Sequence, residues 1–362
     1  MKNATDRLEI TDNMFPELKS ELFSRSLQVL KFSRTHTKRV DREAFKGMVH
    51  LRSLDMSEND IKIIEPAFTG LNSLTDLNLE SNLISEIIPK LFQALKRLRV
   101  LNISKNKINV IHPNAFIGLQ ELEKLSFRFN KMTDLTREIF TGLFKLKELS
   151  FRSNKIKTVT SDVFSDLKSL VVVDLNYNNI NTLGTGTFKD LVKLNKLYLQ
   201  CQQKIISDAL EGLHVNVVTF TAAEKLQNLS SDTISPLHEI LKTVKGVEKI
   251  YFIGGIHELK PGYFENTKLT TIFFRMNNIS IICNDTFKHV SKLRELQIYR
   301  SEITVLEVGA FSNLHKLRIL DLSDNKIKTL QPGLFKGLTS LEVINFRSNM
   351  ISSLHEGVFS EK

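Results

Sequence analysis

The residues that could perform chemistry in this chain are nine histidines and two cysteines, and their spacing fits no catalytic or metal-binding pattern. Neither G-x-S-x-G, H-E-x-x-H, a P-loop nor C-x-x-C occurs anywhere in the sequence. Cys201 and Cys283 belong to segments that are too far apart for a disulfide. The sequence therefore predicts a protein that is not an enzyme and that holds no metal or cofactor.

Asparagine is the residue type with the clearest chemical pattern. Five asparagines stand in N-glycosylation acceptor sequences: Asn3, Asn102, Asn228, Asn278 and Asn284. These possible glycosylation sites favour an extracellular protein, because such glycans are added to secreted chains.

Other asparagines mark an internal repeat. The segments LRSLDMSENDI, LTDLNLESNLI and LRVLNISKNKI share the pattern L-x-x-L-x-L-x-x-N-x-I. Its ninth residue, called the marker below, recurs fifteen times between 13 and 349, ten times as Asn, and nine of the fourteen spacings are 24 residues. The L-x-L core predicts a short strand with one buried face, and the marker amide can bond backbone groups where the chain turns.

Phenylalanine follows the same period, nine or ten residues after most markers. We expect these rings to stack through the core, because one repeat cannot bury its own apolar face. The predicted spine contains Phe23, Phe45, Phe68, Phe92, Phe116, Phe140, Phe164, Phe188, Phe264, Phe287, Phe311, Phe335 and Phe359.

The segments 51–74 (LRSLDMSENDIKIIEPAFTGLNSL) and 317–341 (LRILDLSDNKIKTLQPGLFKGLTSL) carry a resemblance to a known family. They are similar to the 24-residue units of animal extracellular leucine-rich repeat proteins. The chain resembles part of a Toll-like receptor ectodomain or a related arthropod immune protein. The resemblance implies an α/β solenoid, a leucine-rich repeat horseshoe of about 15 repeats, with a parallel β-sheet on its concave face and an irregular or short-helical convex side.

Several functions are compatible with such a fold, because fold alone does not determine function. The resemblance implies recognition of a protein ligand or co-receptor, with homo- or heterodimers as a further option. An adhesive or matrix protein and an intracellular adaptor are the alternatives.

The repeat is expected to be a single solenoid over 1–362, regular over 8–200 and 266–362 and irregular over 201–265. Within the irregular part, Ser235-Pro236 and the apolar spacing that follows predict an inserted helix, Pro236–Lys245. The insertion is either neutral extra length or a site where a partner docks. Because the family's cysteine-rich caps are missing at both ends, the chain is expected to be a fragment.

Strand residues two, four and six positions before each marker should project onto the concave face. In the later repeats these positions, with one neighbour, form a candidate partner-binding surface: Tyr198, Tyr251, Phe273, Arg275, Tyr299 and Arg300. Tyr and Arg are enriched in binding hot spots. The alternative interpretation is that these rings only pack on each other across adjacent strands.

A second group on the same face, Lys124, Arg128 and Arg152, could bind an anion. The net charge is +10, but no run of five like charges occurs, so nucleic acid is an unlikely partner. No apolar run is long enough to span a membrane and Met1–Thr11 does not look like a signal peptide, so no membrane contact is expected within this segment. We expect an extracellular location.

Overall fold

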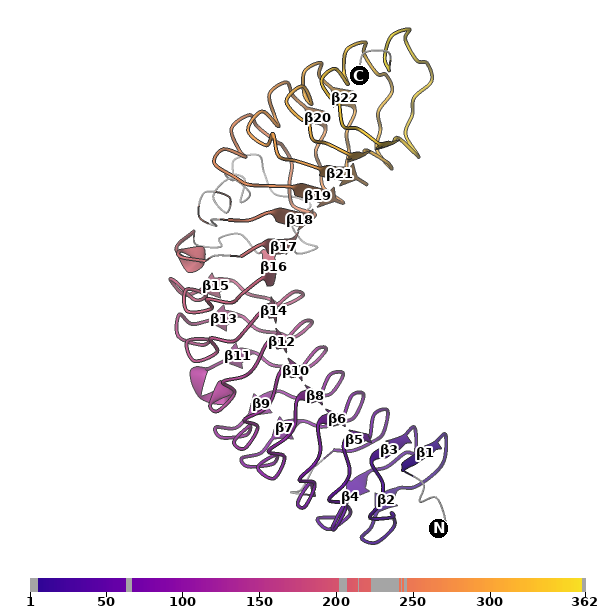
Figure 1. Ribbon diagram of the computed structural model, residues 1–362, viewed down its shortest axis with the longest axis vertical. Coiled ribbons are helices and arrows are strands. Elements are labelled where there is room, and N and C mark those ends of the chain that lie inside the picture. Colours follow the sequence, from indigo (N-terminus) through magenta and orange to yellow (C-terminus); the bar gives the residue numbers. More distant parts are fainter. Residues whose placement is uncertain are drawn as a thin grey trace. The chain divides into compact units, whose positions relative to one another are not determined.

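The computed structural model describes residues 6–62, 67–201, 207–213, 215–222, 241, 243 and 246–359. Contacts between Cα atoms divide the chain into two compact units, Met1–Leu194 (unit 1) and Asn195–Lys362 (unit 2). Each unit is a stack of turns, and each turn adds one short strand to a parallel main sheet (Figure 1). The predicted parallel-strand solenoid is therefore confirmed, whereas the horseshoe shape and the repeat count stay predictions.

The main sheet of unit 1 has its strands in chain order. They are β1 (Arg7–Thr11), β3 (Val29–Ser33), β5 (Ser53–Asp55), β6 (Asp76–Asn78), β8 (Val100–Asn102), β10 (Lys124–Ser126), β12 (Glu148–Ser150) and β14 (Val172–Asp174). Equivalent residues pair directly, as Leu101 does with Leu125 and Leu125 with Leu149. Because the register repeats exactly, residues one period apart form straight columns across the sheet.

Unit 2 has the same organisation. Its main-sheet strands are β16 (Lys196–Cys201), β17 (Val217–Ala222), β18 (Lys249–Ile253), β19 (Thr271–Arg275), β21 (Glu295–Tyr299), β23 (Ile319–Asp321) and β24 (Val343–Asn345). We call the solvent-facing side of either main sheet its sheet face.

The part of each turn away from the main sheet contains almost no helix. Among the described residues it holds two 3-10 turns, η1 (Arg137–Phe140) and η2 (Ser207–Leu210). It also holds two-residue strands: β2 (Glu17–Leu18), β4 (Arg39–Val40), β7 (Glu86–Ile87), β9 (Val110–Ile111), β11 (Asp134–Leu135), β13 (Thr158–Val159), β15 (Thr182–Leu183), β20 (Ile281–Ile282) and β22 (Val305–Leu306). The inserted helix predicted over Pro236–Lys245 lies outside the described residues except for Leu241 and Thr243, which are helical.

The marker asparagines bond neighbouring turns together inside the solenoid. Asn130 is 7% exposed; its Oδ1 accepts a hydrogen bond from the Ile108 N–H at 3.0 Å. Its Nδ2 donates to the carbonyls of Ile103 at 3.0 Å and Phe127 at 3.1 Å. The same contacts recur at Asn82, Asn106, Asn154, Asn178 and Asn325. This role of the marker is confirmed.

The phenylalanine spine is present in both units. In unit 1 the rings of Phe68 and Phe92 stack with centroids 5.9 Å apart, and in unit 2 those of Phe264 and Phe287 stack at 5.6 Å. The spine has a gap between Phe188 and Phe264. A separate inner row of rings crosses this part of unit 2, where the Phe252 ring lies 5.1 Å from Phe220 and 5.9 Å from Phe274.

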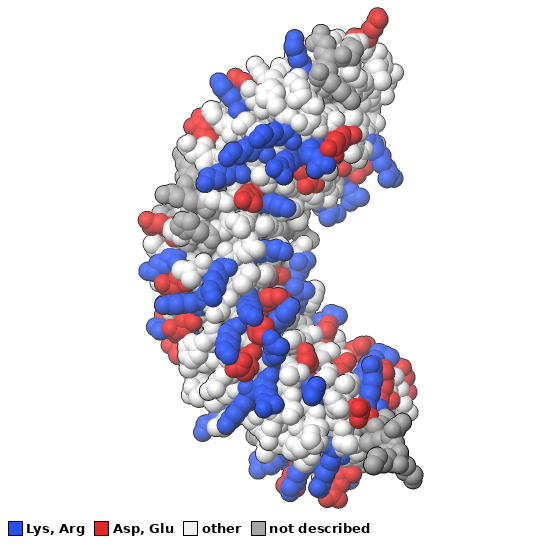
Figure 2. Space-filling view, viewed as in Figure 1, with Lys and Arg blue, Asp and Glu red and all other residues white. Residues whose placement is uncertain are grey.

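Arg99, Glu123 and Lys147 stand just before three successive strands of unit 1 and alternate in sign, and Figure 2 shows basic and acidic side chains intermixed on that unit. The Glu123 carboxylate accepts hydrogen bonds from Arg99 Nε at 3.0 Å and from Lys147 Nζ at 2.8 Å. These two cations lower the pKa of the Glu123 carboxyl to about 2. Two positions earlier in the same turns, Glu121 and Lys145 form an ion pair at 2.6 Å. Arg99, Lys145 and Lys147 are thus each compensated by an acidic side chain of a neighbouring turn.

Candidate functional site

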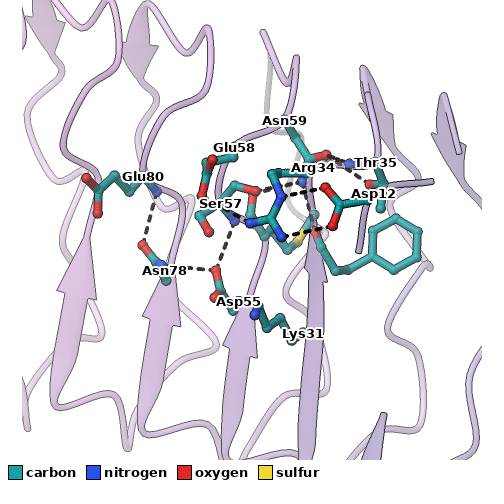
Figure 3. A network of polar contacts seen from close by, with 12 residues as sticks. Asp12, Lys31, Arg34, Thr35, Asp55, Ser57, Glu58, Asn59, Asn78 and Glu80 are labelled. Carbon is teal, nitrogen blue, oxygen red and sulfur yellow. Dashed lines mark hydrogen bonds and ion pairs between the residues drawn. The ribbon is translucent and has the colours of Figure 1, made fainter. Parts of the chain in front are cut away.

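The fourth residue before each marker, called the turn position below, ends the strand in most turns. At this position Asp55 accepts the Ser57 N–H at 3.0 Å, and Asn78 accepts the Glu80 N–H at 3.1 Å (Figure 3). The same bond recurs at Asn102, Asp174, Asp321 and Asn345. A side-chain oxygen that takes the N–H two residues on competes with the sheet ladder. These strands are accordingly three residues long.

In strands β16, β18 and β19 of unit 2 the turn position changes chemistry. Tyr198, Tyr251 and Phe273 occupy it, and their rings offer no oxygen placed for such a turn. The strands β16, β18 and β19 continue to five or six residues as a result. The same substitution therefore lengthens the strands and puts aromatic rings on the sheet face.

Three of the predicted partner-binding residues form a continuous row. The ring centroids of Tyr251 and Phe273 are 5.3 Å apart, and those of Phe273 and Tyr299 are 5.2 Å apart in an edge-to-face arrangement. All three side chains are half-buried. The rings do pack on each other across strands, yet they leave apolar surface on the sheet face.

Arg275 extends this row with a charge. Its guanidinium carbon lies 5.7 Å from the centroid of the Tyr299 ring, within cation–π distance. Its Nε is buried and has no hydrogen-bond partner among the described residues. A buried donor without an acceptor costs free energy.

Tyr198 and Arg300 lie at the margins of the row. Tyr198 is separated from Tyr251 by one strand, since Thr219 of β17 pairs with both residues. Arg300 follows β21 in a left-handed conformation, with φ of 49°, and pairs with Asp324 at 3.5 Å.

The Tyr251 hydroxyl stays protonated and can donate a hydrogen bond. Burial raises the pKa of its phenol, and the nearby Glu295 and Tyr198 raise it further. The hydroxyl is therefore protonated throughout the physiological range.

The second predicted group, in unit 1, is largely matched by its own surroundings. Lys124 pairs with Glu148 at 2.8 Å, Arg128 Nε donates to Ser150 Oγ at 3.0 Å, and the Arg152 guanidinium carbon lies 4.5 Å from the Tyr177 ring centroid. Arg128 also lies 3.8 Å from Asp174, whose pKa is raised chiefly by burial. Arg128 and Arg152 thus both lie near Asp174, and Lys124 lies beside Glu148. These acids lower the net positive charge of the group.

The predicted glycosylation sites have different surroundings. Asn102 is half-buried on the sheet face, where its Nδ2 donates to Glu80 Oε2 at 2.9 Å. Asn278 and Asn284 are exposed and follow β19. Asn3 and Asn228 lie outside the described residues.

The described part of the chain holds no group of three or more His, Cys, Asp or Glu side chains that could bind a metal ion. It also contains no helix long and apolar enough to cross a membrane. Cys283 is a free thiol, and burial raises its pKa.

A stack of parallel strands joined by buried asparagines defines a repeat protein of the solenoid class. The leucine rich repeat family model matches residues 6–203 and 267–361 through overlapping matches that begin at 6–61 and end at 316–361. The chain therefore belongs to the leucine-rich repeat family. Residues 204–266 lie outside these matches.

Solved structures share the fold. Drosophila Toll in its complex with Spatzle is 20% identical with a TM-score of 0.72, over 92% of this chain and 46% of that one. TLR13 in the TLR13-ssRNA13 complex is 22% identical with a TM-score of 0.57, over 95% and 43%. A Leptospira interrogans leucine-rich repeat protein is 22% identical with a TM-score of 0.59, over 91% and 86%.

This chain thus spans less than half of the Toll and TLR13 chains. No curated protein sequence matches it.

Proposed function

We propose that this chain is a non-enzymatic protein-recognition module of an extracellular receptor or secreted immune protein. The observation that carries the proposal is the row formed by Tyr251, Phe273 and Tyr299 on a sheet face that is otherwise mostly polar. Large, rigid rings beside an arginine are typical of binding hot spots, because they bury much area at little cost in side-chain entropy.

The same patch indicates what it binds. The rings offer apolar surface, and the Arg275 guanidinium beside Tyr299 offers N–H donors for a carboxylate or carbonyl oxygen. A protein segment with an apolar side chain next to an acidic one meets both requirements. Tyr198 and Arg300 would contact the ends of that segment.

The extracellular assignment is supported by one structural similarity and by two exposed glycosylation acceptor sites. Toll has been solved bound to Spatzle in a glycosylated form, and its fold is similar to this chain. The exposed acceptor asparagines Asn278 and Asn284 are consistent with the same setting. Glycan on either residue, measured by intact mass after expression in a secreting host, would distinguish this assignment from an intracellular adaptor.

The binding proposal is tested by replacing the row. The wild-type chain should capture a specific protein from conditioned medium, identified and quantified by mass spectrometry. We expect the variant Tyr251→Ser/Phe273→Ser/Tyr299→Ser to capture at least 10-fold less of that protein. The far-UV circular dichroism spectrum should be unchanged, because these side chains lie on the sheet face. Unchanged capture by the folded variant would refute the proposed patch.

Anion binding at Lys124, Arg128 and Arg152 is the second candidate, and Lys124→Gln/Arg128→Gln/Arg152→Gln is its matched variant. Glu148 and Asp174 lie beside these cations and reduce the net charge that could attract a ligand. We therefore expect this variant to capture as much protein as the wild type. An adhesive protein would instead show self-association that survives both triple substitutions, measurable by sedimentation.

A further inference from the structure

Five cations form a second distinct surface in unit 2, just before its main-sheet strands. We call it the basic flank, and Figure 2 shows Lys and Arg gathered on this part of the unit. It consists of Lys268, Lys292, Arg294, Lys316 and Arg318, all of them exposed.

The backbone places these residues on directly stacked turns. The Arg294 N–H donates to the Thr270 carbonyl at 2.8 Å, and the Arg318 N–H donates to the Arg294 carbonyl at 2.8 Å. Lys268, Lys292 and Lys316 stand two positions earlier in the same three turns. Since adjacent parallel strands are about 4.8 Å apart, each column brings like charges to that spacing.

These charges lack the compensation found in unit 1. Among the described residues, Lys268, Lys292, Arg294 and Lys316 have no acidic group within ion-pair distance. The adjacent Glu295 instead accepts a hydrogen bond from Gln297. The equivalent columns of unit 1 alternate Arg99, Glu123 and Lys147 and are ion-paired.

Acidic residues limit the basic flank at both ends. In the column of Arg294, the preceding turns hold Thr270 and Glu248, and the turn after Arg318 holds Glu342. Arg318 pairs with Glu342 through two bonds of 2.7 and 2.8 Å. The uncompensated charge is therefore one column of three lysines, Lys268, Lys292 and Lys316, with Arg294 beside it. Like charges facing each other on neighbouring strands destabilise the fold, and a bound polyanion would relieve that cost.

We propose that the basic flank binds a sulfated polysaccharide. Such a chain presents closely spaced sulfate groups and needs only cations from the protein. Single-stranded nucleic acid binds with aromatic side chains under its bases, and a bilayer binds with inserted apolar side chains. The described residues of the basic flank contain neither.

This surface is separate from the aromatic row, so the proposal does not depend on the protein ligand. The acceptor asparagines Asn278 and Asn284 follow β19, whereas the basic flank precedes the strands. A glycan on Asn278 would start from the opposite end of the strand.

The test uses the full chain and a heparin-derived hexasaccharide, with binding measured by calorimetry at several salt concentrations. The variant Lys268→Gln/Lys292→Gln/Lys316→Gln should bind at least 10-fold more weakly than the wild type. Its binding should also depend less steeply on salt, because fewer counterions are released. Arg97→Gln/Lys145→Gln/Lys147→Gln removes the same charge from unit 1 and should change the affinity less than 2-fold.

Three outcomes would overturn the proposal. One is equal weakening by both triple variants, which would mean that net charge alone attracts the probe. Another is unchanged binding by the unit 2 variant. The third is tighter binding of duplex RNA or of phosphatidylserine vesicles than of the hexasaccharide at equal salt, which would assign the basic flank to a different partner.

Discussion

At the scale of single residues, the marker asparagine explains why this sequence repeats so strictly. One amide satisfies backbone groups of two successive turns, which glutamine or aspartate could not do with the same reach and the same donors. In the turns where its bonds recur, it makes hydrogen bonds that the irregular backbone would otherwise leave unmade. Loss of the amide leaves several buried groups without partners.

Asn130→Ala should therefore be strongly destabilising. It removes the acceptor of the Ile108 N–H and the donor to the Ile103 and Phe127 carbonyls. At about 1–3 kcal/mol for each buried group left unsatisfied, we expect a loss of roughly 2–4 kcal/mol. Urea unfolding provides the measurement. The exposed Asn109→Ala is the control, and equal stability of the two variants would contradict this role.

The turn position shows how one residue type sets both local structure and surface chemistry. Glu9 and Lys31 occupy it in β1 and β3, which are five residues long like the strands that carry aromatics. Where Asp or Asn stands there, the strand stops. The sequence could have revealed this rule, because the side chain needed for the turn is visible in the marker-based alignment.

At the scale of elements, the turns are held together by ring stacking as well as by the sheet. Phe116 is fully buried and stacks on Phe92 with centroids 6.2 Å apart. The sequence predicted this spine from spacing alone, because a ring at a fixed place in every turn must meet its neighbours.

Phe116→Ala should lower the free energy of unfolding by about 3–5 kcal/mol, because it removes a buried ring and leaves a cavity. Thermal and urea unfolding would both report this loss. Phe144, 63% exposed, is the comparison residue, and Phe144→Ala should change stability by less than about 0.5 kcal/mol. A small effect at Phe116 would mean that the spine is not a main source of stability.

At the scale of the whole molecule, contacts in a solenoid join only neighbouring turns, so length changes by whole periods should be tolerated. Removing 119–142 from unit 1 deletes one 24-residue period and joins Gly118 to Leu143, restoring a Gly-Leu pair found at both ends of the deletion. We expect a folded chain with a cooperative transition and a Tm lowered by a few degrees.

Removing only 119–130 is the control for this prediction. It deletes half a period, so strand residues would face turn residues and the marker amides would lose their partners. We expect no cooperative unfolding transition in circular dichroism. If both deletions behaved alike, the stacking of equivalent residues would not be what stabilises the chain.

The sequence by itself determined the repeat, its strands, the marker contacts and the spine, because all of these depend on one period that is visible in the letters. It also identified Tyr251, Phe273, Arg275 and Tyr299 as residues of one face. Tertiary structure decided which of them touch, that Arg275 Nε is buried without a partner, and that Lys124, Arg128 and Arg152 lie beside acids. Only stacking shows that lysines 24 residues apart form the basic flank. Charge compensation depends on distances between turns, and no stretch of sequence shorter than a period contains them.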